Sequence, residues 1–340
     1  MNETINQFEL MGGREMQRSR VARVALMGLA IMLIAACSFT SVLAAKPVTI
    51  GYVSANLTAT SQVRTTNAFK AQTKEIGWKV IAADAKGSWP ALADQIENFV
   101  QMNVDVIVIA MSDLPSIKAA ITTANKANIP VISIDSGVAD GVIADITTDN
   151  YAMGTKVSKY MAERLNGKGN IIVFKFDEHH GTRTRGDALD DVLVDYPQIT
   201  VLATHYLPPA GFMQDAQART ETDITKFGDK IDAVWCPWDG PAMAATMALQ
   251  ASRIGRDKCF VTGVDGEQET FNLIRSGSPL VATVAQPFEL MSKAAIKLVG
   301  EIVVNGRPVD QVVPPTKTIY VDAPLVTPDN VPAKGAWPWD

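Results

Sequence analysis

The sequence lacks the short motifs that enzymes built from alternating strands and helices commonly carry. No G-x-G-x-x-G turn and no phosphate-binding loop follows an apolar run, and after Val53 the chain reads Ser-Ala-Asn-Leu-Thr. Backbone amides approach phosphates closely only where glycines allow it, so this absence argues against a nucleotide site. The hydrolase motif G-x-S-x-G and the metalloprotease motif H-E-x-x-H are also missing.

The sequence also lacks runs of like charge. The 340 residues include 31 lysines and arginines against 36 aspartates and glutamates, for a formal net charge of −5. These charges are interspersed, whereas a protein that binds nucleic acid needs clustered basic residues to neutralise phosphates. We therefore expect no nucleic-acid partner.

Long apolar runs are missing except near the N-terminus. There an uncharged run at residues 24–36 follows four arginines, Arg14, Arg18, Arg20 and Arg23. This order of charge and apolar residues predicts a signal peptide over residues 1–44, cleaved near Ala44. No other segment approaches the ~20 apolar residues of a membrane span.

A second interpretation of the same segment is a lipoprotein signal. Ile34-Ala35-Ala36-Cys37 would then be a lipobox, with Cys37 acylated and tethered to a membrane. The residues after Cys37 stay largely apolar, whereas a lipoprotein carries a polar, flexible spacer there. The cleaved signal peptide is the favoured interpretation, and acylation at Cys37 is the alternative.

Cysteine is scarce, and only two cysteines follow the leader. Cys236 is expected at the end of one strand and Cys259 at the start of a neighbouring parallel strand. That placement holds them more than ~10 Å apart, beyond the reach of a disulfide. We expect both to be buried thiols.

What the chain has in abundance is alternation of short apolar runs with segments of helical period. This pattern is typical of parallel sheets covered on both faces, and it predicts an α/β protein of two doubly wound parallel-sheet lobes. Expected crossovers near Asp149, Gln286 and Pro314 would make both lobes discontinuous. The expected first lobe comprises residues 45–148 plus 287–313, and the second comprises 149–286 plus 314–340.

Polar residues follow most of the expected strands. Ligands of doubly wound sheets bind at the carboxyl ends of strands, so these residues are site candidates. Asp135 and Asp265 each end an apolar strand, where a carboxylate can accept hydrogen bonds from a ligand or cap a helix. Asn56 follows the first strand, and Gln286 follows the strand at residues 281–285.

Three further candidates stand near strand ends. Arg185 opens a helix, where its guanidinium can make two parallel hydrogen bonds with a ligand or form a surface ion pair. Trp238 follows a strand and is a candidate wall of the site, whereas Trp235 is expected in the core. Trp89 is a weaker aromatic candidate.

The segment Asp177-Glu178-His179-His180 carries groups that could bind a metal or act as acid and base. A metal site would need these side chains and His205, one strand later, to converge. A solvated or ligand-facing loop is the favoured interpretation, so we expect no metal, no cofactor and no enzyme. An enzyme using Asp177, Glu178 or His179 is the alternative.

Several stretches, taken in order, resemble the ribose-type periplasmic binding proteins, the pentose and hexose receptors of ABC importers. The stretches are residues 104–109 (VDVIVI), 127–135 (ANIPVISID), 148–150 (TDN) with Gly154, 185–187 (RGD), 261–266 (VTGVDG) and 282–286 (ATVAQ). The likeness covers nearly the whole chain after the leader. The family shares its fold with LacI-type repressors, but a secretion signal stands where a DNA-binding headpiece would be.

The resemblance implies a type I periplasmic binding fold with three crossover strands as a hinge. It also implies that Asp135, Arg185, Asp265 and Gln286 hydrogen-bond a sugar. The implied protein is a periplasmic monomer that delivers a monosaccharide or sugar alcohol to an inner-membrane ABC permease. A sensor subunit that presents the ligand to a chemoreceptor or receptor kinase is the alternative.

Two departures from the family pattern bear on the ligand. Paired phenylalanines follow the first strand in ribose receptors, but here the chain reads Thr58-Ala59-Thr60-Ser61, which leaves Thr60 as a polar candidate and Trp89 as a substitute ring. The family's asparagine before Asp239 is replaced by Trp238. Ribose is therefore in doubt, and an acyclic polyol, a deoxy sugar or an inositol suits the altered pocket as well.

Overall fold

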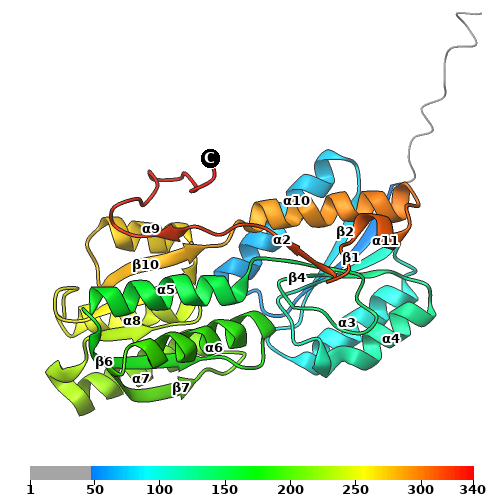
Figure 1. Cartoon of the computed structure of the whole chain (residues 1–340). Helices are drawn as coiled ribbons and strands as arrows, with labels where there is room; N and C mark the ends of the chain where they lie inside the picture. Colours follow the sequence, from blue (N-terminus) through cyan, green and yellow to red (C-terminus); the bar gives the residue numbers. More distant parts are fainter. Residues whose placement is uncertain (1–46) are drawn as a thin grey trace, which may run out of the picture. The chain divides into compact units, whose positions relative to one another are not determined.

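The computed structural model describes residues 47–340 (Figure 1). The expected signal peptide and the alternative lipobox at Cys37 lie outside the described residues. Within residues 47–340, no helix combines the length and the apolar character that crossing a membrane would require.

The first lobe is built on a sheet of strand order β11-β5-β4-β3-β1-β2, in which every pairing is parallel. Its strands are β1 (Thr49–Ser54), β2 (Lys79–Asp84), β3 (Val106–Ala110), β4 (Val131–Ile134), β5 (Asp145–Thr147) and β11 (Thr318–Tyr320). Its helical segments are α2 (Thr60–Glu75), α3 (Trp89–Gln101), η1 (Pro115–Ile117), α4 (Lys118–Lys126), α10 (Phe288–Val299), η3 (Gly300–Val304) and α11 (Val309–Val312).

The second lobe has the strand order β12-β10-β9-β8-β6-β7, and only β12 runs antiparallel to its neighbour. Its strands are β6 (Lys168–Lys175), β7 (Gln198–Tyr206), β8 (Ala233–Trp235), β9 (Phe260–Asp265), β10 (Leu280–Ala285) and β12 (Leu325–Val326). Its helical segments are α5 (Asn150–Arg164), α6 (His180–Asp195), α7 (Phe212–Phe227), η2 (Gly228–Lys230), α8 (Asp239–Ala251) and α9 (Gln268–Arg275).

Each sheet lies between two helical layers, which explains why the central strands β3, β4, β8 and β9 are buried along their whole length. In the first lobe α2 and α10 pack together on one face, and α3 and α4 cover the other (Figure 1). In the second lobe α7, α8 and α9 cover one face, and α5 and α6 cover the other. Burial of this apolar surface on both faces is the main stabilising term of each lobe.

Local sequence sets where the helices begin. Ser88 and Asp149 are N-caps whose side chains accept hydrogen bonds from the backbone N–H groups of Ala91 and Ala152. Such caps satisfy amides that have no partner within the helix. Trp235 is buried and donates a hydrogen bond to Ser158, as expected of a core residue.

The two cysteines behave as the sequence predicted. Cys236 follows β8 and Cys259 precedes β9, and these strands pair in parallel. Both thiols are free and buried. Burial raises the pKa of the Cys259 thiol to about 12, so it stays protonated and unreactive at neutral pH.

The chain passes between the lobes at residues 148–149, at 286–287 and at 321–324. The first two positions agree with the expected crossovers near Asp149 and Gln286. The third differs, because residues 314–320 belong to the first lobe and not to the second. Thr318–Tyr320 pairs with β5 and supplies hydrogen-bond partners to an edge that would otherwise lack them.

The last residues of the chain, 327–340, form a C-terminal strap on the second lobe. Arg275 donates to the carbonyl of Pro332, and Gln268 donates to the carbonyl of Ala336. At its end the strap reaches Arg64 of α2, whose guanidinium carbon lies 3.6 Å from the ring centre of Trp337. The strap therefore contacts both lobes.

Candidate functional site

A cavity of about 520 Å³, counted to its opening, lies between the two lobes. The first lobe lines it with Asn56, Ala59, Ser61, Gln62, Met111 and Asp135. The second lobe lines it with Phe176, His179, Thr182, Arg185, Pro208, Pro209, Phe212, Trp238 and Asp265. The carboxyl ends of β1, β4, β6, β8 and β9 converge here, as parallel-sheet topology requires.

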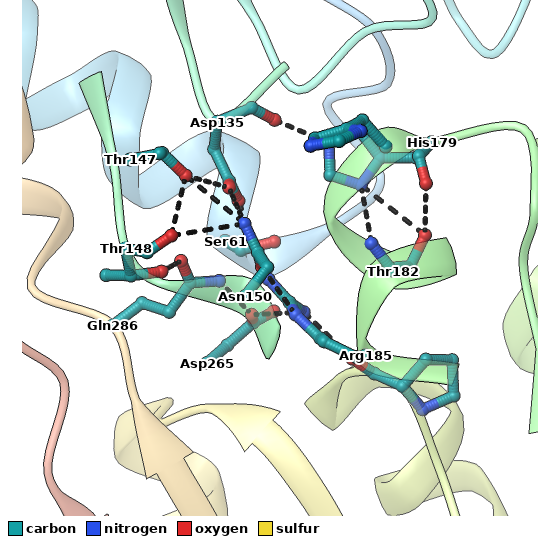
Figure 2. A network of polar contacts seen from close by, with 12 residues as sticks. Ser61, Asp135, Thr147, Thr148, Asn150, His179, Thr182, Arg185, Asp265 and Gln286 are labelled. Atoms are coloured by element: carbon teal, nitrogen blue, oxygen red, sulfur yellow. Dashed lines mark hydrogen bonds and ion pairs between the residues drawn. The ribbon is translucent and has the colours of Figure 1, made fainter. Parts of the chain in front are cut away.

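Arg185, in the second turn of α6, is the charged centre of the cavity (Figure 2). It is only 2% exposed, and its Nε donates to Asn150 Oδ1 at 2.8 Å while Nη1 donates to the carbonyl of Pro237 at 2.8 Å. Its Nη2 lies 3.6 Å from Asp135, and its Nη1 lies 3.6 Å from Asp265. These ion pairs are longer than hydrogen bonds, so the guanidinium keeps donors for a bound molecule.

Asp135 comes from the first lobe, immediately after β4. Thr147 and Asn150 both donate to its Oδ1, while no hydrogen bond to its Oδ2 is formed among residues 47–340. Burial alone would raise its pKa, but the nearby Arg185 guanidinium and these hydrogen bonds hold the pKa below its usual value. Asp135 is therefore an ionised acceptor at neutral pH.

Asp265 comes from the second lobe, at the end of β9. Gln286 donates to its Oδ1 at 2.9 Å, and the same amide accepts a hydrogen bond from Thr148 at 2.8 Å. Burial raises the pKa of Asp265 to about 6, against the lowering effect of Arg185. Thr148 and Gln286 lie in two of the three crossovers, so this chain of bonds ties a cavity carboxylate to the hinge.

Both carboxylates sit on unusual backbone. Asp135 has a φ of 50°, and Asp265 has a φ of 126°. Residues other than glycine adopt such conformations at an energetic cost of ~1–3 kcal/mol, and they persist where surrounding contacts determine them. The strain falls on the two acids that flank Arg185.

His179 caps α6 and contacts the first lobe. Its Nδ1 accepts a hydrogen bond from the backbone N–H of Thr182, so its Nε2–H donates to the carbonyl of Asp135 (Figure 2). Burial lowers the pKa of His179, which keeps the ring neutral at physiological pH. His179 thus joins the lobes as a neutral donor beside the charged pair.

The apolar side of the cavity consists of three aromatic rings from the second lobe. Trp238 meets Phe176 and Phe212 at ring-centre distances of 5.7 and 5.2 Å, both edge to face. Such geometry favours a rigid wall. A cavity lined by aromatic rings, a guanidinium and two carboxylates suits a molecule with C–H faces and hydroxyl edges.

The lobes touch at further points around the cavity. Asn56 donates through its Nδ2 to the carbonyl of Pro209 at 2.9 Å. Trp89 donates through its indole N–H to Glu178 at 2.9 Å. These contacts join the first lobe to two loops of the second and partly close the cavity.

The structure brings five of the eight predicted site residues to one cavity: Asn56, Asp135, Arg185, Trp238 and Asp265. Gln286 does not line the cavity but holds Asp265. Trp89 lies at the contact between the lobes described above, and its ring does not line the cavity. Thr60 is exposed and borders a second cavity.

Several site residues were not predicted from the sequence. Asn150 bridges Asp135 and Arg185, and its place in the stretch Thr148-Asp149-Asn150 was a usable signal. Phe176 lies one residue beyond β6, and directly after an apolar strand it carries no signal that separates it from the core. Phe212 begins α7 and carried no distinguishing signal, because a phenylalanine at a helix start is more often core.

The alternative of a metal site finds no support in residues 47–340. These contain no group of three or more His, Cys, Asp or Glu side chains placed to hold a metal ion. His205 pairs with Asp223 at 2.6 Å, far along the sequence from the loop at residues 177–180.

Comparison with known proteins agrees with this geometry. A family model described as a periplasmic binding protein domain matches residues 50–307. The chain belongs to this family. Its membership confirms the predicted resemblance and the two-lobed fold, and a family of binding proteins supports the expectation that the chain is not an enzyme.

Three individual proteins that resemble this chain share less than 30% of their residues with it. A xylitol-binding protein of Mycolicibacterium smegmatis is 28% identical over 265 residues, which cover 77% of this chain and 71% of that protein. The ribose import binding protein of Bacillus subtilis is 27% identical over 300 residues, covering 85% and 94%. A solved ABC transporter solute-binding protein from Agrobacterium vitis with bound allitol is 27% identical, with a TM-score of 0.77 and coverage of 84% and 97%.

Proposed function

We propose that the chain captures a monosaccharide or sugar alcohol between its two lobes and delivers it to an ABC importer of the inner membrane. The observation that carries this proposal is the cavity itself, where Arg185 stands between Asp135 and Asp265 and faces a wall of three aromatic rings. Hydroxyl groups both donate and accept, so they can pair with the guanidinium and with the unbonded carboxylate oxygens at once.

An acyclic sugar alcohol is the favoured ligand class within this proposal. The first-lobe segment at residues 58–61 contributes no ring, so the aromatic wall stands on one side of the cavity only. Relatives named for xylitol and solved with allitol support the same class. The proposed protein is a periplasmic monomer exported by the signal peptide at residues 1–44, and it needs neither metal nor cofactor.

The test is a thermal-shift screen of the mature protein, refolded to remove any ligand carried from the cell. A molecule that binds only the folded state stabilises it, by about 2.7 kcal/mol at a concentration of roughly 100 times Kd. We expect one stereochemical series among tetritols, pentitols, hexitols, pentoses, hexoses and inositols to raise the melting temperature.

Two variants test the assigned site. The ligand should no longer raise the melting temperature of Arg185→Ala, whereas it should still raise that of the control variant Arg183→Ala. Arg183 lies on the same helix and donates to the carbonyl of Asp177 outside the cavity. No shift with any compound would contradict the proposed ligand class. An equal shift in the Arg185→Ala variant would contradict the assigned site.

A further inference from the structure

A second cavity of about 370 Å³ adjoins the first. It lies between the start of α2, at residues 58–61, and the N-terminal turns of α7 and α8. The two cavities share the side chains of Ala59, Ser61, Phe212, Trp238 and Asp265. A molecule longer than the first cavity can therefore extend past Trp238 into the second.

Small residues keep this space open on both sides. Thr58-Ala59-Thr60-Ser61 places no large side chain there from the first lobe. On the second lobe, a Cβ atom at Gly240 would lie 2.7 Å from Trp238 Nε1 and 2.8 Å from the Phe212 ring. Gly240 thus allows the indole to stand between the two cavities as a partition.

Glu267 lines only the second cavity, and its carboxyl group is unsatisfied. The residue is 3% exposed, and its Oε1 has no hydrogen-bond partner among the described residues. Buried polar atoms are paired in the great majority of cases, so an orphan at a cavity wall indicates a missing partner. Burial also raises the pKa of Glu267 well above its usual value.

The cations near Glu267 are already engaged. Arg64 makes two hydrogen bonds to Glu289, at 2.7 and 2.8 Å, and further bonds to backbone carbonyls. Arg185 lies between Asp135 and Asp265. Asp239, which accepts a hydrogen bond from the Glu267 backbone N–H at 2.9 Å, adds another buried carboxyl group. None of these groups therefore supplies a hydrogen-bond partner to Glu267 Oε1.

We propose that the second cavity is a ligand compartment in which Glu267 accepts a hydrogen bond from the far end of a ligand whose near end lies on Arg185. The donor is a hydroxyl group of the ligand. This inference rests on the proposed function and narrows it. The ligand is an extended polyol that spans both cavities.

Calorimetric titration of refolded protein with erythritol, xylitol, allitol, sorbitol and 1-amino-1-deoxysorbitol tests this inference. Glu267→Ala should weaken the longest probes by about tenfold, the usual consequence of losing one buried hydrogen bond, and should leave erythritol unchanged. Glu267→Gln should restore binding of the hydroxyl probes, because an amide oxygen still accepts a hydrogen bond. 1-Amino-1-deoxysorbitol should bind no more tightly than sorbitol, because the raised pKa of Glu267 leaves no carboxylate to pair with its ammonium group.

Two further variants keep the test decisive. Glu269→Gln is the matched control, because Glu269 is an exposed carboxylate in the first turn of α9, outside both cavities. Met243→Trp fills the second cavity from α8 without altering any residue that lines the first, and it should weaken long probes selectively. The melting temperature of each ligand-free variant checks folding.

The outcomes separate this inference from the proposed function. The compartment is supported if Glu267→Ala and Met243→Trp both weaken the binding of the long probes and leave the affinity for erythritol unchanged. Unchanged affinity for every probe in both variants overturns the compartment and leaves the proposed function standing. Failure of the wild-type protein to bind any of the five probes, or any compound of the thermal-shift screen, overturns both.

Discussion

The two lobes contribute unequally to the cavity that lies between them. The first lobe supplies mainly small or flexible side chains and a single carboxylate, that of Asp135. The second supplies the guanidinium of Arg185, the carboxylate of Asp265 and all three aromatic rings. The comparison indicates that a ligand is held chiefly by the second lobe, while the first completes the enclosure.

The largest effect that would sharpen this comparison is expected for Arg185→Ala. Removing the guanidinium deletes charge-assisted hydrogen bonds to the ligand and leaves Asp135 and Asp265 buried without a counter-charge. We expect affinity to fall by about a hundredfold, and stability to fall as well. Calorimetry with the ligand found by the thermal-shift screen measures the first effect, and Arg183→Ala is the control. A loss below threefold would refute the central role of Arg185.

A smaller loss of affinity is expected when side chains of the two cavity walls are compared, one wall from each lobe. Trp238→Ala removes the indole from the second-lobe wall and should weaken binding by about tenfold, whereas Trp238→Phe should retain most of the affinity. Asn56→Ala removes a first-lobe amide that bonds to Pro209 and should weaken binding by only about threefold. Equal losses in Trp238→Ala and Asn56→Ala would break the proposed asymmetry.

The smallest effect concerns stability and compares one buried carboxyl group in each lobe. Burial raises the pKa of Asp145 in the first lobe to about 7, and that of Asp239 in the second to about 7. The folded state then holds a proton that the unfolded chain releases near pH 4. The stabilisation from each group is therefore full below about pH 4 and is lost at about 1.4 kcal/mol per pH unit as the pH rises toward 7.

Asp145→Asn cannot titrate, so its free energy of unfolding relative to wild type should increase between pH 5 and pH 8. Urea unfolding at the two pH values measures this difference, and Asp239→Asn provides the same comparison in the second lobe. An identical difference at both pH values would show that the carboxyl group is ionised throughout this range.

The sequence predicted the fold well because the long elements carry strong periodicity. β3 is an uninterrupted apolar run, β4 is apolar except for Ser133, and the helices between strands show an apolar face. β5 and β12 were not predicted, because three and two residues are too few to display a period. The third crossover was misplaced because the residues after Pro314 were expected in the second lobe, whereas pairing with β5 assigns Thr318–Tyr320 to the first.

The site was predictable where a polar residue directly follows a strand, as with Asp135 and Asp265. Topology alone brings such residues to one edge of the sheets. Side-chain direction was not predictable in the same way. Thr60 borders the second cavity, and Trp89 hydrogen-bonds Glu178 where the lobes touch. Phe176 and Phe212 reach the cavity through loop geometry that no local pattern encodes.

The C-terminal strap has a mechanical consequence. The three covalent crossovers are not the only links between the lobes. The stack of Trp337 on Arg64 adds a non-covalent link between the strap and α2. A rotation that draws α2 away from the strap must break that stack, together with the hydrogen bonds from Arg64 to the carbonyls of Asp265 and Gly266, so these contacts add to the energetic cost of opening the lobes.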